Sequence, residues 1–235
     1  MQKIWKMFPE LTKTVRETHL QVGLVGWGHD FEHAVRVAQC AIKIAENEYI
    51  GRLAGIAGLC HNADRILEYK LYKENNTKTK KDVLPSEISA LIKNWLNFLP
   101  FRFLNYDERD SIIAAILKHD KANEPTDSAI CIALMDADRI VNAEIDCIIR
   151  SVQHRPDISA IDFVQWLNDP TATYREPKSI LRGLNYALEW EDHPKFGLRL
   201  PKAQVMGESR FQYIRQYIDI LHSQLKESGL IPYPF

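Results

Sequence analysis

Apolar residues recur at helical spacing along most of the chain. Between residues 31 and 49 they step by three and four, while charged residues occupy another face, which is typical of an amphipathic helix. A second, more uniformly apolar helix should cover about residues 50–61. Further helices are predicted from Pro85 to before Pro100, and from Asp107, a candidate N-cap, to about Asp120. No alternating pattern of strand type stands out. The pattern therefore predicts an all-α fold.

The second half of the chain continues this pattern. A long helix is predicted from Glu124 to about Gln153, followed by helices near residues 158–168, 177–191 and 202–228. Residues 70–82 are polar and read as an exposed loop, and residues 192–201 read as a loop before the last helix. No repeat or sharp change of composition divides the chain, so we expect a single globular helical domain over residues 1–235.

Composition narrows the class of protein. The 235 residues include 30 Lys and Arg against 31 Asp and Glu, and 46% are hydrophobic. Such a chain is typical of a soluble globular protein and argues against a nucleic-acid-binding role, because its net charge of −1 gives phosphates no attraction. No apolar stretch approaches the roughly 18–20 residues of a membrane span, and the N-terminus lacks a signal-peptide pattern. The four cysteines stand apart among apolar neighbours, which favours buried thiols in a reducing, cytoplasmic compartment.

Four polar side chains fall within or beside apolar helix stripes: His33, His61, His119 and Asp136. Residues three, four and seven apart share a helix face, so these side chains should point toward the core. A buried carboxylate requires a cation or strong donors nearby. For each residue alone, a core hydrogen bond or salt bridge explains the burial. Together, three imidazoles and a carboxylate are the ligands that a divalent transition metal takes, which favours a metal site.

Four segments in order also match a known pattern. They are Gly28–Val37, Gly55–Asn62, Ile112–His119 and Leu134–Ile140. With them the chain resembles the HD superfamily of metal-dependent phosphohydrolases, over about residues 15–150. The resemblance implies an HD-type helical core there, with residues 151–235 as a C-terminal helical extension packed on it. The literal dipeptide His29-Asp30 is better explained by Asp30 capping a helix, and His119-Asp120 by the additional family histidine. His61 is then the central family histidine.

The resemblance implies a divalent metal ion (Mn, Fe, Co, Ni, Zn or Mg) held by His33, His61, Asn62 and Asp136. The family has Asp where this chain has Asn62, so the site has one negative charge fewer and should bind a metal less tightly. Asp64 is a candidate for the missing carboxylate, although a salt bridge with Arg65 explains it equally well.

The catalytic residues implied by the resemblance are His119, Asp64 and Arg36. His119 would contact the phosphate or act as general acid, and Arg36 would bind phosphate, unless it is a solvated residue on the polar helix face. Asp138 either pairs with Arg139 or turns inward toward the site.

Three functions are compatible with these residues. The first is a metal-dependent phosphohydrolase that acts on a nucleotide or another small phosphate-containing substrate. The second, motivated by Asn62, is a degenerate HD domain that binds a nucleotide or a partner without catalysis. The third is a redox enzyme with a dinuclear iron site, which requires more carboxylates and histidines than the sequence places near one another. The oligomeric state stays open.

Overall fold

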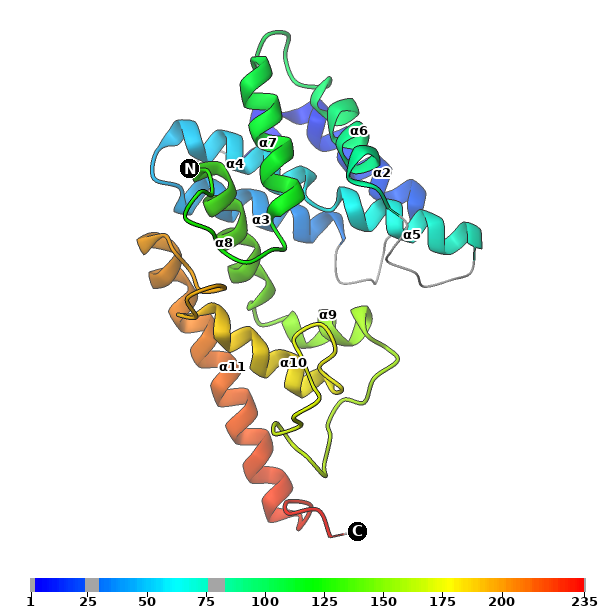
Figure 1. The fold of residues 1–235 in the computed structure, drawn as a ribbon, viewed down its shortest axis with the longest axis vertical. Helices are drawn as coiled ribbons and strands as arrows, with labels where there is room; N and C mark the ends of the chain where they lie inside the picture. The colour runs from blue at the N-terminus through cyan, green and yellow to red at the C-terminus, as the bar shows by residue number, and fades with distance from the viewer. Residues whose placement is uncertain (1–2, 24–29, 76–82, 235) are drawn as a thin grey trace.

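The computed structural model describes residues 3–23, 30–75 and 83–234 and is shown in Figure 1. These residues form helices and turns, without a strand among them, which confirms the all-α prediction. The helices are α1 (Ile4–Met7), α2 (Pro9–Val22), α3 (Phe31–Ile44), α4 (Glu48–Cys60), α5 (Ala63–Asn75), α6 (Pro85–Leu96), α7 (Tyr106–Lys118), α8 (Ala129–Asn142), α9 (Cys147–His154), α10 (Ile180–Ala187) and α11 (Pro201–Glu227), with a short 3-10 turn at Leu188–Trp190.

Helices α3, α4 and α8 pack against one another at the centre of the core, and α7 lies against α4 and α8 (Figure 1). Small residues allow α3 and α4 to approach closely. A Cβ added at Gly58 would lie 2.9 Å from the Cα of Ala38, closer than real Cβ contacts allow. The C-terminal end of α4, which carries His61, is therefore pressed against the helix that carries His33.

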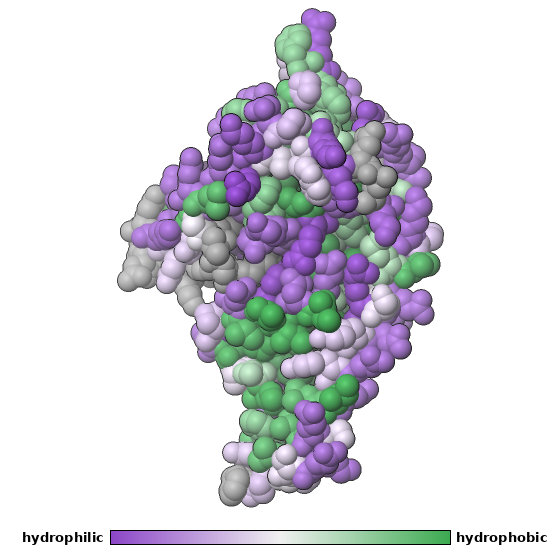
Figure 2. All heavy atoms as spheres, turned by 180° about the vertical axis from the view of Figure 1, so that it is seen from behind, coloured by the Kyte–Doolittle hydropathy of each residue, from purple (hydrophilic) through white to green (hydrophobic). Residues whose placement is uncertain are grey.

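The other helices flank this centre on two sides. Helices α2, α5 and α6 contact one another, and α9, α10 and α11 form the lower part of the molecule in Figure 1. The long helix α11 also packs against α8 and α3. Seen from behind, apolar surface gathers on the lower part, while the upper part is mostly hydrophilic (Figure 2).

Two of the expected helix boundaries differ from the sequence prediction in the first half of the chain. The helix expected to reach residue 49 ends at Ile44, because the side chain of Asn47 accepts a hydrogen bond from the backbone N–H of Ile50 and starts α4 there. Helix α7 is capped by Asn105 rather than by Asp107. Polar side chains cap whichever turn the packing selects, so several candidates in one stretch are not distinguished by sequence.

The expected long helix over residues 124–153 is wrong. Ser128 caps α8, which ends at Asn142, and α9 begins at Cys147. The connection over residues 143–146 is held by tertiary bonds that an uninterrupted helix could not form. The guanidinium of Arg36 donates to Glu144 at 2.9 Å and to Asp146 at 2.8 Å.

Residues 155–179 contain no helix, so the helix expected near 158–168 is also wrong. The buried guanidinium of Arg182 binds this segment, donating to Asp162, to the carbonyl oxygen of Trp166 and to that of Pro177. Helix α10 begins only after Ser179, whose side chain caps it, and is shorter than the predicted 177–191.

Other expectations are confirmed. Helix α11 covers the predicted 202–228 segment, and Asp30 caps α3 by accepting from the backbone N–H of His33 at 2.8 Å. The four cysteines are free and buried. Of the expected loop at 70–82, the first part belongs to α5, and residues 76–82 lie outside the described residues, as do Gly28 and His29. Among the described helices, none has both the length and the apolar character that a bilayer crossing demands.

Candidate metal centre

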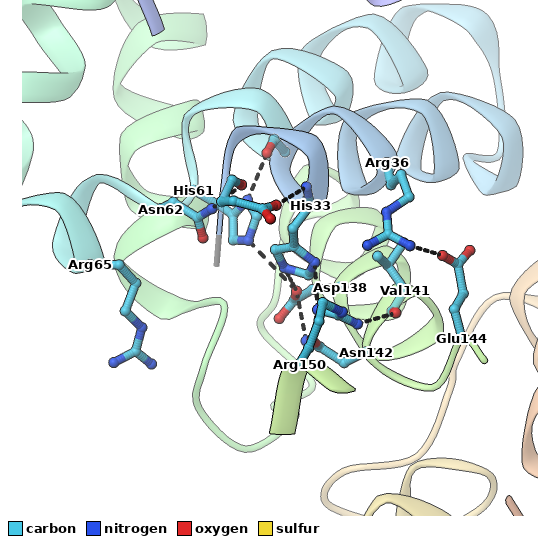
Figure 3. A network of polar contacts seen from close by, with 12 residues as sticks. His33, Arg36, His61, Asn62, Arg65, Asp138, Val141, Asn142, Glu144 and Arg150 are labelled. Atoms are coloured by element: carbon cyan, nitrogen blue, oxygen red, sulfur yellow. Dashed lines mark hydrogen bonds and ion pairs between the residues drawn. The ribbon is translucent and has the colours of Figure 1, made fainter. Parts of the chain in front are cut away.

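Three side chains from three helices converge in the core. His33 on α3, His61 at the C-terminal cap of α4 and Asp138 on α8 each offer a ligand atom, and these atoms all lie within 4.8 Å of one another (Figure 3). Both histidines are buried, and the side chain of Asp138 is 18% exposed. We call these three residues the His–His–Asp cluster. Its position follows from the contact of α3, α4 and α8 at the centre of the fold.

Hydrogen bonds determine the tautomer of His33. Its Nδ1 lies 3.0 Å from the Nη1 atom of Arg150, and its Nε2 lies 3.1 Å from Oδ1 of Asp138. A guanidinium can only donate, so Nδ1 accepts and the ring proton is on Nε2, where it is donated to Asp138. Arg150 also donates to the side chain of Asn142 at 3.1 Å and to the carbonyl oxygen of Val141 at 2.7 Å (Figure 3).

His61 presents a lone pair to the same carboxylate. Its Nδ1 donates to the carbonyl oxygen of Gly58 at 2.7 Å, which leaves Nε2 without a proton in the neutral ring. This Nε2 is buried, has no hydrogen-bond partner among the described residues, and lies 3.6 Å from Oδ1 of Asp138. Burial lowers the pKa of His61 to about 3, so the ring is neutral at pH 7. The lone pair of His61 Nε2 and the carboxylate oxygen of Asp138 both seek a positive partner, so a cation between them would stabilise both. Imidazole nitrogen and carboxylate oxygen are ligands that a divalent metal ion takes.

Asp138 is the charged member of the cluster. Burial would raise its pKa, but the hydrogen bond from His33 prevails and holds the pKa well below its usual range. Its Oδ1 also accepts from the amide nitrogen of Asn142 at 2.9 Å. The carboxylate is therefore ionised at neutral pH and oriented by two donors toward the histidines.

Asp136, the predicted carboxylate ligand, lies outside the cluster. It is fully buried, and its Oδ2 accepts from the backbone N–H groups of Arg199 and Leu200 at 2.8 Å each, at the start of α11. The guanidinium of Arg139 lies 3.8 Å from its other oxygen. The donors that close α11 onto α8 thus satisfy Oδ2, whereas the buried Oδ1 has no hydrogen bond from the described residues and faces only the more distant guanidinium of Arg139. Two residues apart on a helix, Asp136 and Asp138 point to different sides, and it is Asp138 that turns to the histidines.

Asn62 and Asp64 follow His61 at the turn between α4 and α5. Asn62 is buried beside His61 (Figure 3), and its amide nitrogen donates to the carbonyl oxygen of Asp30 at 3.3 Å. Asp64 is partly exposed in the first turn of α5, with Oδ2 3.7 Å from Nε of Arg65. The structure therefore keeps Asn62 next to the cluster, while Asp64 forms the ion pair that was the alternative explanation for it.

The other two predicted catalytic residues differ in their distance from the cluster. His119 caps the end of α7, and its ring lies edge-on to that of His61, with 5.3 Å between ring centroids. Its Nδ1 donates to the carbonyl oxygen of Ile116 at 2.6 Å, which leaves Nε2 as the acceptor atom of the neutral ring. Arg36 instead turns toward Glu144 (Figure 3), and both of its terminal nitrogens bind carboxylates of the α8–α9 connection.

Two residues of this network, Asn142 and Arg150, are not among the site residues predicted from the sequence. The spacing of Asp138 and Asn142, four residues apart on one face of α8, is a signal that could have placed them together. No such signal exists for Arg150, because it reaches His33 only through the break between α8 and α9.

Comparisons with known proteins bear on the fold. No family model matches the chain, and no curated protein matches it. Among solved structures it is similar to YpgQ from Bacillus subtilis in its selenomethionine form, with a TM-score of 0.60 at 16% identity, covering 95% of this chain and 96% of that one. It is equally similar to YpgQ in complex with ADP (TM-score 0.60, 17% identity, 95% and 97% covered). A protein from Lactobacillus plantarum also matches (TM-score 0.60, 15% identity, 94% and 98% covered). The chain therefore shares the helical fold of YpgQ over nearly its whole length.

Proposed function

We propose that this protein is a metal-dependent phosphohydrolase of the HD type, in which His33, His61 and Asp138 hold one divalent ion. The observation that carries the proposal is the buried Nε2 of His61, which faces the ionised Asp138 at 3.6 Å without a hydrogen bond from the described residues. A purely structural core would place a donor between these atoms, because buried polar atoms are nearly always paired. A site with two imidazoles and one carboxylate suits Mn, Fe, Co, Ni or Zn.

In the proposed reaction, the metal ion and the side chains around it have different roles. When bound, the ion supplies a polarised phosphoryl oxygen and an acidified water. The chain orients the ligands: Gly58 fixes the ring of His61 through its carbonyl oxygen, and Asn142 fixes Asp138. His119 lies beside His61 and is the residue we assign to contact the phosphate or to protonate the leaving oxygen. We assign no catalytic role to Arg36, since both ends of its guanidinium bind carboxylates.

The substrate we propose is a nucleotide or another small phosphate ester. Support comes from the similarity to YpgQ, of which a complex with ADP has been crystallised. A divalent ion at the cluster would also complement the negative charge of a phosphate group. Asn62, the neutral neighbour of His61, leaves a single carboxylate in the centre, so metal affinity should be lower than in a site with two.

The test uses protein stripped with a chelator and reloaded with each metal. Hydrolysis of nucleoside mono-, di- and triphosphates and of a chromogenic phosphodiester is measured, and Asp138→Ala is compared with Asp136→Ala as a matched control. We expect metal-dependent turnover that Asp138→Ala abolishes and that Asp136→Ala retains in its folded fraction. Absence of turnover with every metal and substrate, together with no metal binding, refutes the proposal.

A second function is favoured by Asn62. With one carboxylate in the centre, the protein would bind a nucleotide without hydrolysing it. Calorimetric nucleotide binding without turnover in the natural protein, and turnover created by Asn62→Asp, would identify this function. Turnover in the natural protein excludes it.

A further inference from the structure

Arg150 places a guanidinium directly on a ring nitrogen of the proposed metal ligand His33. Its Nη1 lies 3.0 Å from Nδ1 of His33, and the residue is 7% exposed. The same guanidinium is anchored by Asn142 at 3.1 Å and by the carbonyl oxygen of Val141 at 2.7 Å. Arg150 comes from α9, a helix that packs on α10, outside the three helices that form the cluster.

This contact conflicts with metal binding at His33. The atom of His33 that faces Asp138 is Nε2, and it carries the ring proton because Nδ1 accepts from Arg150. An ion in the cluster needs the lone pair of Nε2, so the proton of the neutral ring must move to Nδ1. That nitrogen would then face the guanidinium, and two donors would oppose each other at the present 3.0 Å. Metal-binding histidines normally donate their second N–H to an acceptor.

We propose that Arg150 opposes metal binding at His33 and that a divalent ion binds only when the guanidinium of Arg150 leaves Nδ1 of His33. The proposal rests on the proposed function, in which His33 is a ligand. The guanidinium keeps Asn142 and Val141 as partners on its own side, which stabilises the metal-free arrangement.

Two variants of Arg150 separate the effect from a general loss of structure. In Arg150→Gln the amide oxygen can accept from Nδ1–H of His33, which is the arrangement a metal-bound ring requires. Arg150→Lys keeps a cation that can only donate. Calorimetric titration of chelator-stripped protein with Mn, Co or Zn should show binding about tenfold tighter or more for Arg150→Gln than for the natural protein, since a hydrogen bond to a charged group is no longer broken. Arg150→Lys should stay close to the natural protein.

A second measurement does not depend on the variants. Nitrogen-15 NMR of the histidine rings, with His33→Gln to assign the signal, reports which ring nitrogen carries the proton. We expect Nε2–H at His33 in the stripped natural protein and Nδ1–H after metal addition. A stripped protein with Nδ1–H at His33 overturns the inference, even if a variant fails to fold.

The outcomes also separate this inference from the proposed function. If the natural protein and Arg150→Gln bind metal equally well, the inference fails and the metal site stands. If Arg150→Lys gains as much affinity as Arg150→Gln, the donor conflict is not the cause and the inference also fails. If neither the natural protein nor Arg150→Gln binds any metal, both proposals fail.

Discussion

Replacing Asn62 by Asp should make the protein less stable without metal and more strongly stabilised by it. Asn62 is 1% exposed, and its amide nitrogen donates to the carbonyl oxygen of Asp30 at 3.3 Å. A carboxylate has no proton to donate, so it would place a buried negative charge against that carbonyl oxygen. Losing this bond and burying an uncompensated charge together cost about 2–4 kcal/mol. For a chain of this size the melting temperature should fall by roughly 5–15 °C in chelator.

Bound to the centre, a divalent ion should stabilise Asn62→Asp more than it stabilises the natural protein. With Asp at position 62, the centre would have two carboxylates beside His33 and His61, and the buried charge would gain a cation. At a free metal concentration 100 times the dissociation constant, binding adds about 2.7 kcal/mol to the free energy of unfolding. The metal-induced rise in melting temperature should therefore be larger for Asn62→Asp than for the natural protein at the same metal concentration.

The assay is thermal unfolding in chelator and in a series of Mn and Zn concentrations. Asn62→Leu is the matched control, because it loses the same hydrogen bond without adding a charge; it should be destabilised in chelator and should not be rescued by metal. The reasoning is refuted if Asn62→Asp is as stable as the natural protein in chelator and metal raises its melting temperature no further than that of the natural protein.

Three more predictions concern polar groups of the core and its rim. Asp136→Ala removes the acceptor of two backbone N–H groups at the start of α11. It should lower the unfolding free energy, measured by urea unfolding, by about 3 kcal/mol. The metal content, measured by elemental analysis, should stay unchanged. In chelator, the unfolding free energy should fall by about 2 kcal/mol from pH 7 to pH 5 through His61 alone, because its ring binds a proton near the ordinary pKa of 6.5 when unfolded and only near 3 when folded. This stability is present above pH 6.5 and is lost as pH falls, so urea unfolding of His61→Gln should show a shallower pH dependence; an unchanged slope contradicts the burial argument. Arg36→Ala should lower stability by about 1 kcal/mol through its two ion pairs, with metal affinity by calorimetry changed by no more than a few-fold.

The sequence by itself determined the fold class and the burial of two imidazoles, His33 and His61. Helical periodicity places His33 and His61 on apolar faces, and burial there follows from the free energy of covering those faces. It also determined that a carboxylate would be buried on the helix over residues 129–142, and Asp136 is fully buried.

Only the tertiary structure decided which carboxylate meets the histidines. Periodicity relates the faces of one helix to each other, but it does not say which neighbouring helix each face will meet. Helix α8 packs against α3 and α4 on one side and against α11 on another, so Asp138 faces the imidazoles and Asp136 faces the backbone of α11. The position of Arg150 depends in turn on the break after Asn142, where bonds from the distant Arg36 to Glu144 and Asp146 replace those of a continuous helix. Local pattern cannot predict such a break, because its stabilising partners come together only in the folded chain.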